Sequence, residues 1–171
     1  MNADIRPYER GDAEALLEAV RESMAELAPW MPWCHPGYSI EDARGWIEAT
    51  LEGHRSGTHY DFAIVAGAQL LGGCGINQIQ PLDQVANLGY WVRSSCTGQG
   101  IATTAVRQLL RWGFENTELN RIEIVVAVGN RRSQRVAEKI GAHRDAVLAR
   151  RTMVRGRPSA AVLYSVLRPE A

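Results

Sequence analysis

Residues 88–106 read LGYWVRSSCTGQGIATTAV, and they pass from a strand pattern through a glycine loop into a helix pattern. Gly98-Gln99-Gly100 stands between the two elements, where the first free N–H groups of the helix and its positive dipole end point into the loop. Because glycine has no Cβ atom, a phosphate can approach this backbone closely. The stretch therefore predicts an anion site, with a plain tight turn as the alternative. Neither a Rossmann fingerprint nor a P-loop fits, since residue 103 is Thr and no Gly-Lys pair is present.

The elements around this loop indicate an α+β fold. Apolar residues recur at helical spacing over residues 13–28, and Ser39 and Asp42 form a capping-box-like start for a second helix that Gly53 and Gly57 close. Strand patterns cover residues 60–65, 70–79 and 87–92 before the loop. After the helix that follows it come a strand at 121–128, a helix at 131–140 and strands at 145–152 and 160–167. The order predicts one domain over residues 1–171.

The length of 171 residues, with 46% apolar and 22% charged residues, is typical of one compact globular domain. No apolar run is long enough to cross a bilayer, and the first residues lack the order of a signal peptide, so we expect a cytoplasmic protein without membrane contacts. The three cysteines, Cys34, Cys74 and Cys96, fit neither a disulfide framework nor a C-x-x-C metal site. We therefore expect no metal.

The net charge is zero, but its distribution is uneven. Residues 1–100 carry 6 basic and 13 acidic residues, and residues 101–171 carry 13 basic and 6 acidic ones. The second part is suited to an anion. Crossed ion pairs that neutralise the two parts on folding are the alternative.

Two separated motifs resemble the acetyl-CoA site of the Gcn5-related N-acetyltransferase (GNAT) superfamily. The family loop [RQ]-x-x-G-x-[GA] is similar to residues 97–102, with Thr97 in place of the leading Arg or Gln. The family's second block is matched by Asn130, Ser133, Val136, Lys139 and Gly141. The resemblance implies a single domain with a mixed, mostly antiparallel sheet, one splayed strand pair and about four flanking helices.

Upstream, residues 27–43 resemble the RimJ/RimL type, the ribosomal-protein N-terminal acetyltransferases and their small-molecule relatives. This likeness implies transfer of an acetyl group from acetyl-CoA to a primary amine through a tetrahedral intermediate. The acceptor is then a protein N-terminal α-amine or a small-molecule amine, with no nucleic acid partner. A homodimer is an extrapolation from the same likeness.

The resemblance also assigns donor-site residues. Backbone groups of Trp91 and Val92 are expected to hold the pantetheine arm, with the Val92 N–H as oxyanion donor. Ser133 is expected to hydrogen-bond the sulfur and help protonate the thiolate, since the tyrosine that serves in some relatives is Ala137 here. The remaining expected acetyl-CoA contacts are Thr97, Gly98, Gln99, Gly100, Ile101, Ala102, Thr103, Asn130, Arg131 and Arg132. Close packing for Ser133 and a helix N-cap for Asn130 are the alternatives.

The acceptor side is less defined by sequence. Trp30, Trp33 and Tyr38 lie in one irregular loop and are expected, with Asn77, to bind the acceptor, although such tryptophans also commonly fix a helix corner to the core. No general base is assigned. His35, His59, Tyr60 and Asp61 are candidates acting through water, and a surface or strand-end role is the alternative for each.

The missing base, Thr97 and Ala137 also motivate a second hypothesis, a non-catalytic acetyl-CoA sensor or interaction module of the same fold. A third is nucleic-acid binding by the arginine-rich second part, for which no focused motif is present.

Overall fold

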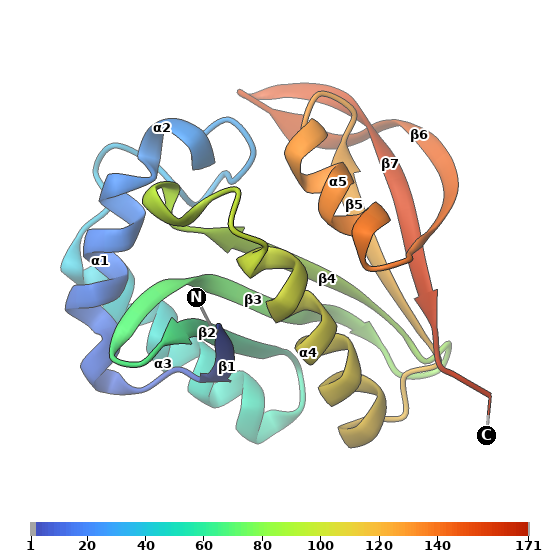
Figure 1. Ribbon diagram of the computed structural model, residues 1–171, viewed down its shortest axis with the longest axis horizontal. Helices are drawn as coiled ribbons and strands as arrows, with labels where there is room; N and C mark the ends of the chain where they lie inside the picture. Colours follow the sequence, from blue (N-terminus) through green and yellow to red (C-terminus); the bar gives the residue numbers. More distant parts are fainter. Residues whose placement is uncertain (1–2, 171) are drawn as a thin grey trace.

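The computed structural model describes residues 3–170, which form a seven-stranded mixed sheet with helices on both faces (Figure 1). The strand order is β1-β2-β3-β4-β5-β7-β6, and every neighbouring pair is antiparallel except β4 and β5. The strands are β1 (Asp4–Pro7), β2 (Tyr60–Ala66), β3 (Gln69–Gln80), β4 (Val85–Val92), β5 (Arg121–Ala127), β6 (His143–Val154) and β7 (Arg157–Leu167). The helices are η1 (Arg10–Asp12), α1 (Ala13–Glu22), α2 (Met24–Leu27), α3 (Ile40–Ser56), η2 (Ser94–Cys96), α4 (Ile101–Asn116) and α5 (Arg131–Lys139). The predicted α+β class is confirmed.

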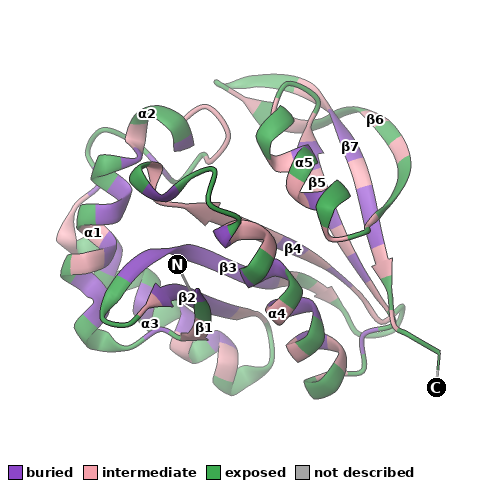
Figure 2. Ribbon diagram, in the orientation of Figure 1, coloured by how far each residue is buried: buried purple, intermediate pink, exposed green. Residues whose placement is uncertain are grey.

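Two apolar clusters hold the helices to the sheet. One joins α4 and α5 to one face, with Leu109, Ile122 and Ala137 fully buried. The other joins α1 and α3 to the opposite face of the first strands, with Leu16 and Ile47 at its centre. Figure 2 shows the buried residues concentrated along the strands and the inner sides of these helices.

The sheet separates between its two parallel strands. β4 pairs with β5 only from Val85 to Asn87, while β4 continues to Val92 alongside β3. In Figure 1 the two strands lie together near the C-terminus and diverge toward the start of α4. We call the opening between residues 88–92 of β4 and the facing part of β5 the β4–β5 gap. The splayed strand pair implied by the resemblance is therefore present.

A β-bulge lies on β3, the strand on the other side of β4. The register between β3 and β4 shifts between Asn77 and Gln80, and Gln78 has a φ of +50°, so the extra residue belongs to β3. β4 itself pairs residue for residue with β3 from Asn87 to Val92.

Local sequence signals account for most element boundaries. Asp42 N–H donates to Ser39 Oγ at 3.2 Å and Ser39 N–H donates to Asp42 Oδ2 at 2.8 Å, which confirms the predicted capping box of α3. Gly57 ends that helix with a φ of +71°. The single helix predicted for residues 13–28 is wrong in detail, because it breaks at Ser23, whose hydroxyl accepts the Ser94 N–H at 3.0 Å. The sequence reasoning also missed the edge strand β1.

Within residues 3–170 no helix is long and apolar enough to span a bilayer.

Candidate active site

The β4–β5 gap is lined by backbone groups whose direction follows from strand register. The Arg93 N–H donates to the Leu71 carbonyl of β3 at 2.7 Å. Because successive residues of a strand direct their N–H and C=O groups to opposite sides, those of Val92 point away from β3 into the gap. Those of Tyr90 point the same way. Since the pairing of β4 with β5 among residues 3–170 ends at Asn87, the Val92 N–H faces the gap outside that ladder, and its role as oxyanion donor stays a prediction.

The backbone groups of Trp91, expected to hold the pantetheine arm, do not face the gap. A Cβ atom on Gly72 of β3 would lie 2.2 Å from the Trp91 carbonyl oxygen, so this carbonyl is directed at β3 and not at the gap. The Trp91 side chain instead lies on the face covered by α1 and α3, 6.0 Å from Trp33 between ring centroids. Tyr90 takes the place of Trp91 as the second residue of β4 with backbone groups in the gap.

The glycine loop lies exposed at the upper end of the gap. Gly98 and Gly100 have φ values of +77° and +79°, which residues with a side chain rarely adopt, and a Cβ atom on either would meet nothing within 4 Å. The loop is thus both glycine-dependent and open to a ligand. Gly100 is the N-cap of α4 and supplies no side-chain cap, so the first N–H groups of the helix face the loop.

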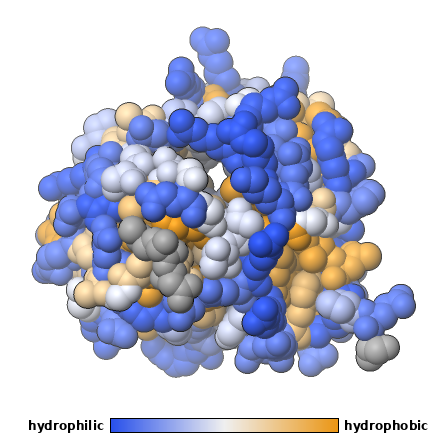
Figure 3. Space-filling model, viewed as in Figure 1, coloured by the Kyte–Doolittle hydropathy of each residue, from blue (hydrophilic) through white to orange (hydrophobic). Residues whose placement is uncertain are grey.

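The other expected loop residues divide between core and surface. Ile101 is buried beneath α4, as predicted, while Thr97 and Gln99 are exposed and Ala102 and Thr103 are half-buried. The Thr97 hydroxyl donates to the Ser94 carbonyl at 3.0 Å. Figure 3 shows the surface hollowed near the centre of the view, where Figure 1 places the start of α4 opposite α5.

Across the gap, α5 presents Asn130 and Ser133. Asn130 is the N-cap, since its Oδ1 accepts the Ser133 N–H at 3.2 Å. Tyr90 Oη lies 2.8 Å from the Ser133 carbonyl, to which it donates, and 2.9 Å from Ser133 Oγ. Burial raises the pKa of Tyr90 to about 12, so this phenol stays protonated. The Tyr90–Ser133 contact joins both walls of the gap, and sequence reasoning that sought a tyrosine only on the helix missed it. Arg131 and Arg132 are exposed at the start of α5.

A cavity of about 590 Å³ lies next to the gap, on the face of the sheet covered by α1 and α3. We call it the aromatic cavity because rings form much of its wall. It is lined by Tyr8, Leu16, Met31, Trp33, His35, Tyr38, Asp42, Gly45, Trp46, Ala49, Asp61, Gly73, Cys74, Gly75, Asn77, Gly89, Tyr90 and Trp91. Its volume is in the usual range for small-ligand sites.

Three of the four residues expected to bind an acceptor line this cavity: Trp33, Tyr38 and Asn77. Trp30 does not line it, so no described contact supports its expected role, which stays a prediction. Its ring lies against Gly129 at the end of β5, where an added Cβ would be 3.5 Å away. It therefore connects the loop after α2 to the far side of the gap.

Asp61 is the buried carboxylate of the aromatic cavity. Its side chain is 10% exposed, and burial raises its pKa to about 6, with His59 at 3.8 Å acting in the opposite direction. The sequence reasoning weighed Asp61 and did not assign it. The available signal was a charged residue inside the apolar strand run DFAIV.

The charges of the two parts of the chain do not cancel one another. Among residues 3–170, no carboxylate of the first hundred residues lies in an ion pair with an arginine beyond residue 100. Arg93 pairs with Glu18 and Glu22 of α1. Hydrogen bonds from Ser95, and then Arg93, hold the pKa of Glu22 at about 2. The crossed neutralisation considered from sequence is therefore wrong for the described residues.

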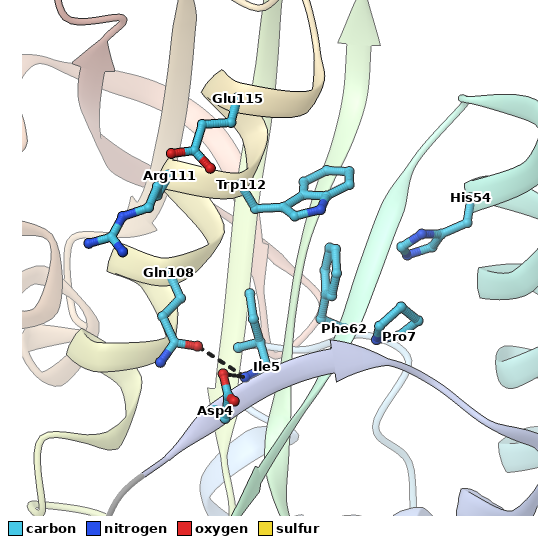
Figure 4. A pocket seen from close by; sticks show the side chains of 9 residues that line it. All are labelled: Asp4, Ile5, Pro7, His54, Phe62, Gln108, Arg111, Trp112 and Glu115. Atoms are coloured by element: carbon cyan, nitrogen blue, oxygen red, sulfur yellow. Dashed lines mark hydrogen bonds between the residues drawn. The ribbon is translucent and has the colours of Figure 1, made fainter.

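A second hollow, of about 530 Å³, lies between β1 and α4 (Figure 4). Gln108, one of several polar residues that line it, is already engaged with β1, since its Oε1 accepts the Ile5 N–H at 3.0 Å and its Nε2 donates to the Ala3 carbonyl at 3.0 Å. Trp112, Phe62 and His54 line it and meet in tilted and edge-to-face contacts, with ring centroids 4.9 to 6.2 Å apart. The Gln108 hydrogen bonds hold the edge strand β1 to α4, and none of the residues that line this hollow belongs to the gap.

Comparison with known proteins decides the family. The sequence profile of the acetyltransferase (GNAT) domain matches residues 3–143. The chain belongs to the GNAT acetyltransferase family. It is 34% identical over 97% of its length to the protein named "Putative ribosomal N-acetyltransferase YdaF" of Bacillus subtilis, covering 91% of that protein. It is 30% identical to the ribosomal-protein-serine acetyltransferase of Escherichia coli, over 74% of this chain and 70% of the other.

Solved structures agree on the fold of this GNAT protein. RimL, a ribosomal L7/L12 alpha-N-protein acetyltransferase solved in complex with coenzyme A, superposes with a TM-score of 0.91. It is 22% identical, with 98% of this chain and 94% of that chain covered. Family membership favours an acetyl-CoA-dependent N-acetyltransferase over the non-catalytic sensor.

The glycine loop, the backbone donors of the gap and Ser133 fit this co-substrate. Open glycines can accept a pyrophosphate, and an unpaired strand edge can hydrogen-bond the amides of a pantetheine arm. Among residues 3–170, no cluster of three or more His, Cys, Asp or Glu side chains is arranged to hold a metal ion.

Proposed function

We propose that this N-acetyltransferase acetylates the α-amine at the N-terminus of a protein, with ribosomal proteins as the acceptor class. The observation that carries the proposal is the aromatic cavity, whose wall includes Gly89, Tyr90 and Trp91, the residues of β4 that precede Val92 along the gap. An amine in this cavity lies next to the one strand edge where a thioester can be held. The names of the curated relatives, which refer to ribosomal proteins, support the acceptor class.

In the reaction, the neutral amine nitrogen attacks the thioester carbonyl carbon, forming the N–C bond. The Val92 N–H is placed to donate to the oxyanion that develops. The C–S bond then breaks, and the proton that the nitrogen loses reaches the thiolate through water and the Ser133 hydroxyl, which gives up one proton and takes another. A thiolate is a weak base, so a hydroxyl held by Tyr90 is sufficient. Arg131 and Arg132 are proposed to contact the phosphates of the donor.

The charges of the aromatic cavity favour a single ammonium over a polyamine. Of its lining residues only Asp42 and Asp61 carry carboxylates. Asp42 is engaged in capping α3, because it accepts the Ser39 N–H and hydroxyl at 2.8 and 3.0 Å. One carboxylate is left for the acceptor. A peptide α-ammonium matches this count, whereas a polyamine or aminoglycoside brings two or more cations.

The test is acetylation of a panel of ribosomal-protein N-terminal peptides, followed by mass spectrometry and by release of free CoA thiol. Each peptide contains an internal lysine, and its N-terminally blocked form serves as the matched control. We expect acetylation at the free α-amine and no product from the blocked peptides. Spermidine and an aminoglycoside are tested in parallel, and acetylation of these compounds alone would contradict the proposal.

The proposal also places the protein in the cytoplasm, where ribosomal proteins are synthesised. The oligomeric state, including the expected homodimer, stays a prediction that light scattering can check.

A further inference from the structure

One row of residues crosses the floor of the aromatic cavity from β2 to the edge of β4. Asp61 pairs with Gly75 of β3, and Gly75 pairs with Gly89 of β4. Residues directly opposite each other in a sheet point to the same face, so the two glycines leave a trough along the row. The trough begins at the Asp61 carboxylate and ends at β4 beyond its last pair with β5, which is Asn87. It therefore leads into the β4–β5 gap.

The carboxylate extends along this trough. A Cβ atom on Gly75 would lie 2.0 Å from Asp61 Oδ1, so the carboxylate occupies the space above Gly75. Neighbouring strands are about 4.8 Å apart, which places the carboxylate roughly one strand spacing from Gly89. A Cβ atom on Gly89 would meet nothing within 4 Å, so the trough is empty there.

No structural role accounts for the buried carboxylate. Within residues 3–170 no group donates a hydrogen bond to its oxygens, although the residue is only 7% exposed. The His59 Nε2 atom is 3.8 Å from Asp61 Oδ2, beyond hydrogen-bond distance, and lies 3.1 Å from the Ala49 carbonyl oxygen. Among residues 3–170 no fully buried side-chain oxygen lacks a hydrogen-bond partner, so the unpaired oxygens of Asp61 are open to the cavity. A largely buried carboxylate without a protein partner is costly, and such a group is characteristic of sites that bind a ligand or transfer protons.

We propose that Asp61 is the general base of the reaction and the residue that captures the incoming ammonium in the trough. This inference rests on the proposed amine acceptor. The ammonium pairs with the carboxylate above Gly75 and transfers one proton to it. The neutral nitrogen, over Gly89, then attacks the thioester at the β4 edge. The nitrogen then loses its second proton, which water and the Ser133 hydroxyl pass to the departing thiolate, while Asp61 keeps the first proton until the products leave and then releases it to solvent.

The surroundings of Asp61 suit this role. A base works best when its pKa is near the operating pH, and burial raises that of Asp61 to about 6. His59 faces it from the residue before β2, the phenol of Tyr8 from the segment between β1 and η1, and His35 and Asp42 from across the cavity, while Cys74 precedes Gly75 with its side chain on the opposite face of the sheet. Burial raises the pKa of both Tyr8 and Cys74, which keeps these two groups neutral.

The primary experiment compares Asp61→Asn with Asp83→Asn, which removes an exposed carboxylate in the turn between β3 and β4. Whichever amine of the panel the wild type acetylates is the acceptor, so failure of the peptide class alone leaves this test intact. We expect kcat/KM of Asp61→Asn to fall at least 100-fold, with the acetyl-CoA Kd within twofold of wild type. The acid limb of the kcat/KM profile near pH 6 should disappear. Loss of less than threefold, or an unchanged acid limb, would overturn the proposal.

A second pair of variants tests the trough. Gly89→Ala places a methyl group between the carboxylate and the gap without a clash, and Gly11→Ala is a control with equally free space outside the cavity. We expect Gly89→Ala to raise the acceptor KM at least tenfold at unchanged Tm. An unchanged acceptor KM would show that the amine does not pass over Gly89 on its way from Asp61 to the gap.

If the wild type acetylates no amine of the panel, the proposed function fails, and carbon NMR of the acetyl-CoA-bound protein still decides about Asp61. A carboxyl signal that titrates near 6 and is absent from Asp61→Asn supports the proposal. Titration near the ordinary value overturns it.

Discussion

The β4–β5 gap and the aromatic cavity meet at β4, yet they are built from different parts of the polypeptide. The gap presents backbone groups and short polar side chains from one continuous segment, residues 88–139. The aromatic cavity is made of residues brought together from the segment before η1, from α1, from the loop after α2, from α3 and from three strands. The gap depends on backbone conformation at a few glycines, whereas the cavity depends on which residues stand opposite one another in the sheet.

Their electrostatics differ in the same way. The acidic first part of the chain surrounds the aromatic cavity, and the basic second part supplies α4, α5 and the strands beyond the gap. Because no ion pair among residues 3–170 links these two parts, the opposite fields persist on either side of β4. An ammonium and a polyphosphate are each attracted to the side proposed to bind it.

The largest effect is expected where the gap depends on a backbone that only glycine adopts readily. Gly100→Leu places a side chain at a φ of +79° in the open loop, and we expect the acetyl-CoA Kd to rise at least 100-fold by calorimetry. Gly156→Leu is the matched control, since Gly156 has a φ of +74° and equal free space in the turn between β6 and β7. An equal loss of acetyl-CoA affinity in both variants would mean that backbone strain, and not the blocked loop, causes the effect.

The aromatic cavity should show the opposite behaviour, a gain of stability on removal of its charge. Asp61 has its folded-state pKa raised to about 6 from 3.8, so the native state favours the protonated form. Below pH 3.8 the carboxyl is protonated in both states, and it does not lower the free energy of unfolding. Between pH 3.8 and about 6 its ionisation lowers that free energy progressively, and above about pH 6 the full loss of about 3 kcal/mol applies. Asp61→Asn should therefore unfold later than wild type at pH 8, with the difference vanishing near pH 4 in urea titrations. A wild type that is more stable than the variant at pH 8 would contradict this assignment.

A smaller effect is expected at the Tyr90–Ser133 contact, which spans the gap. Ser133→Ala should lower kcat about tenfold to thirtyfold with little change in the acetyl-CoA Kd, because the hydroxyl acts on the departing thiolate. Tyr90→Phe removes the group that holds this hydroxyl and should have a smaller effect of the same kind. If the two act as one unit, the double variant will lose no more than Ser133→Ala alone. Additive losses, measured by thiol release, would separate their roles.

The contrast between the two sites also explains which of them could be predicted from sequence. The gap was predictable because Gly98, Gly100 and Ser133 occur at fixed spacing within one strand-loop-helix-strand-helix segment. The cavity was not, because the row from Asp61 to Gly89 exists only through the register of three strands. The same limit applies to Trp30 and Trp33, which are three residues apart and were expected to act together. The turn between them sends one ring to Gly129 and the other to the cavity.

The smallest predicted effect concerns Thr97, the position at which the loop departs from the family pattern. Its exposed hydroxyl donates only to Ser94, so the side chain contributes no cation to the anion site. Thr97→Arg should lower the acetyl-CoA Kd about twofold to fivefold, since an exposed charge-assisted contact contributes roughly 0.5 to 1 kcal/mol. Thr104→Arg adds the same charge to an exposed position one turn into α4. If the guanidinium at position 97 contacts the phosphates directly, Thr97→Arg will gain more acetyl-CoA affinity than Thr104→Arg. That gain will persist in about 0.3 M salt, where the long-range attraction between charges is screened within about one Debye length. Equal gains that vanish together in salt would mean that only the summed field of the basic part matters and that the leading position of the loop has no specific role in this chain.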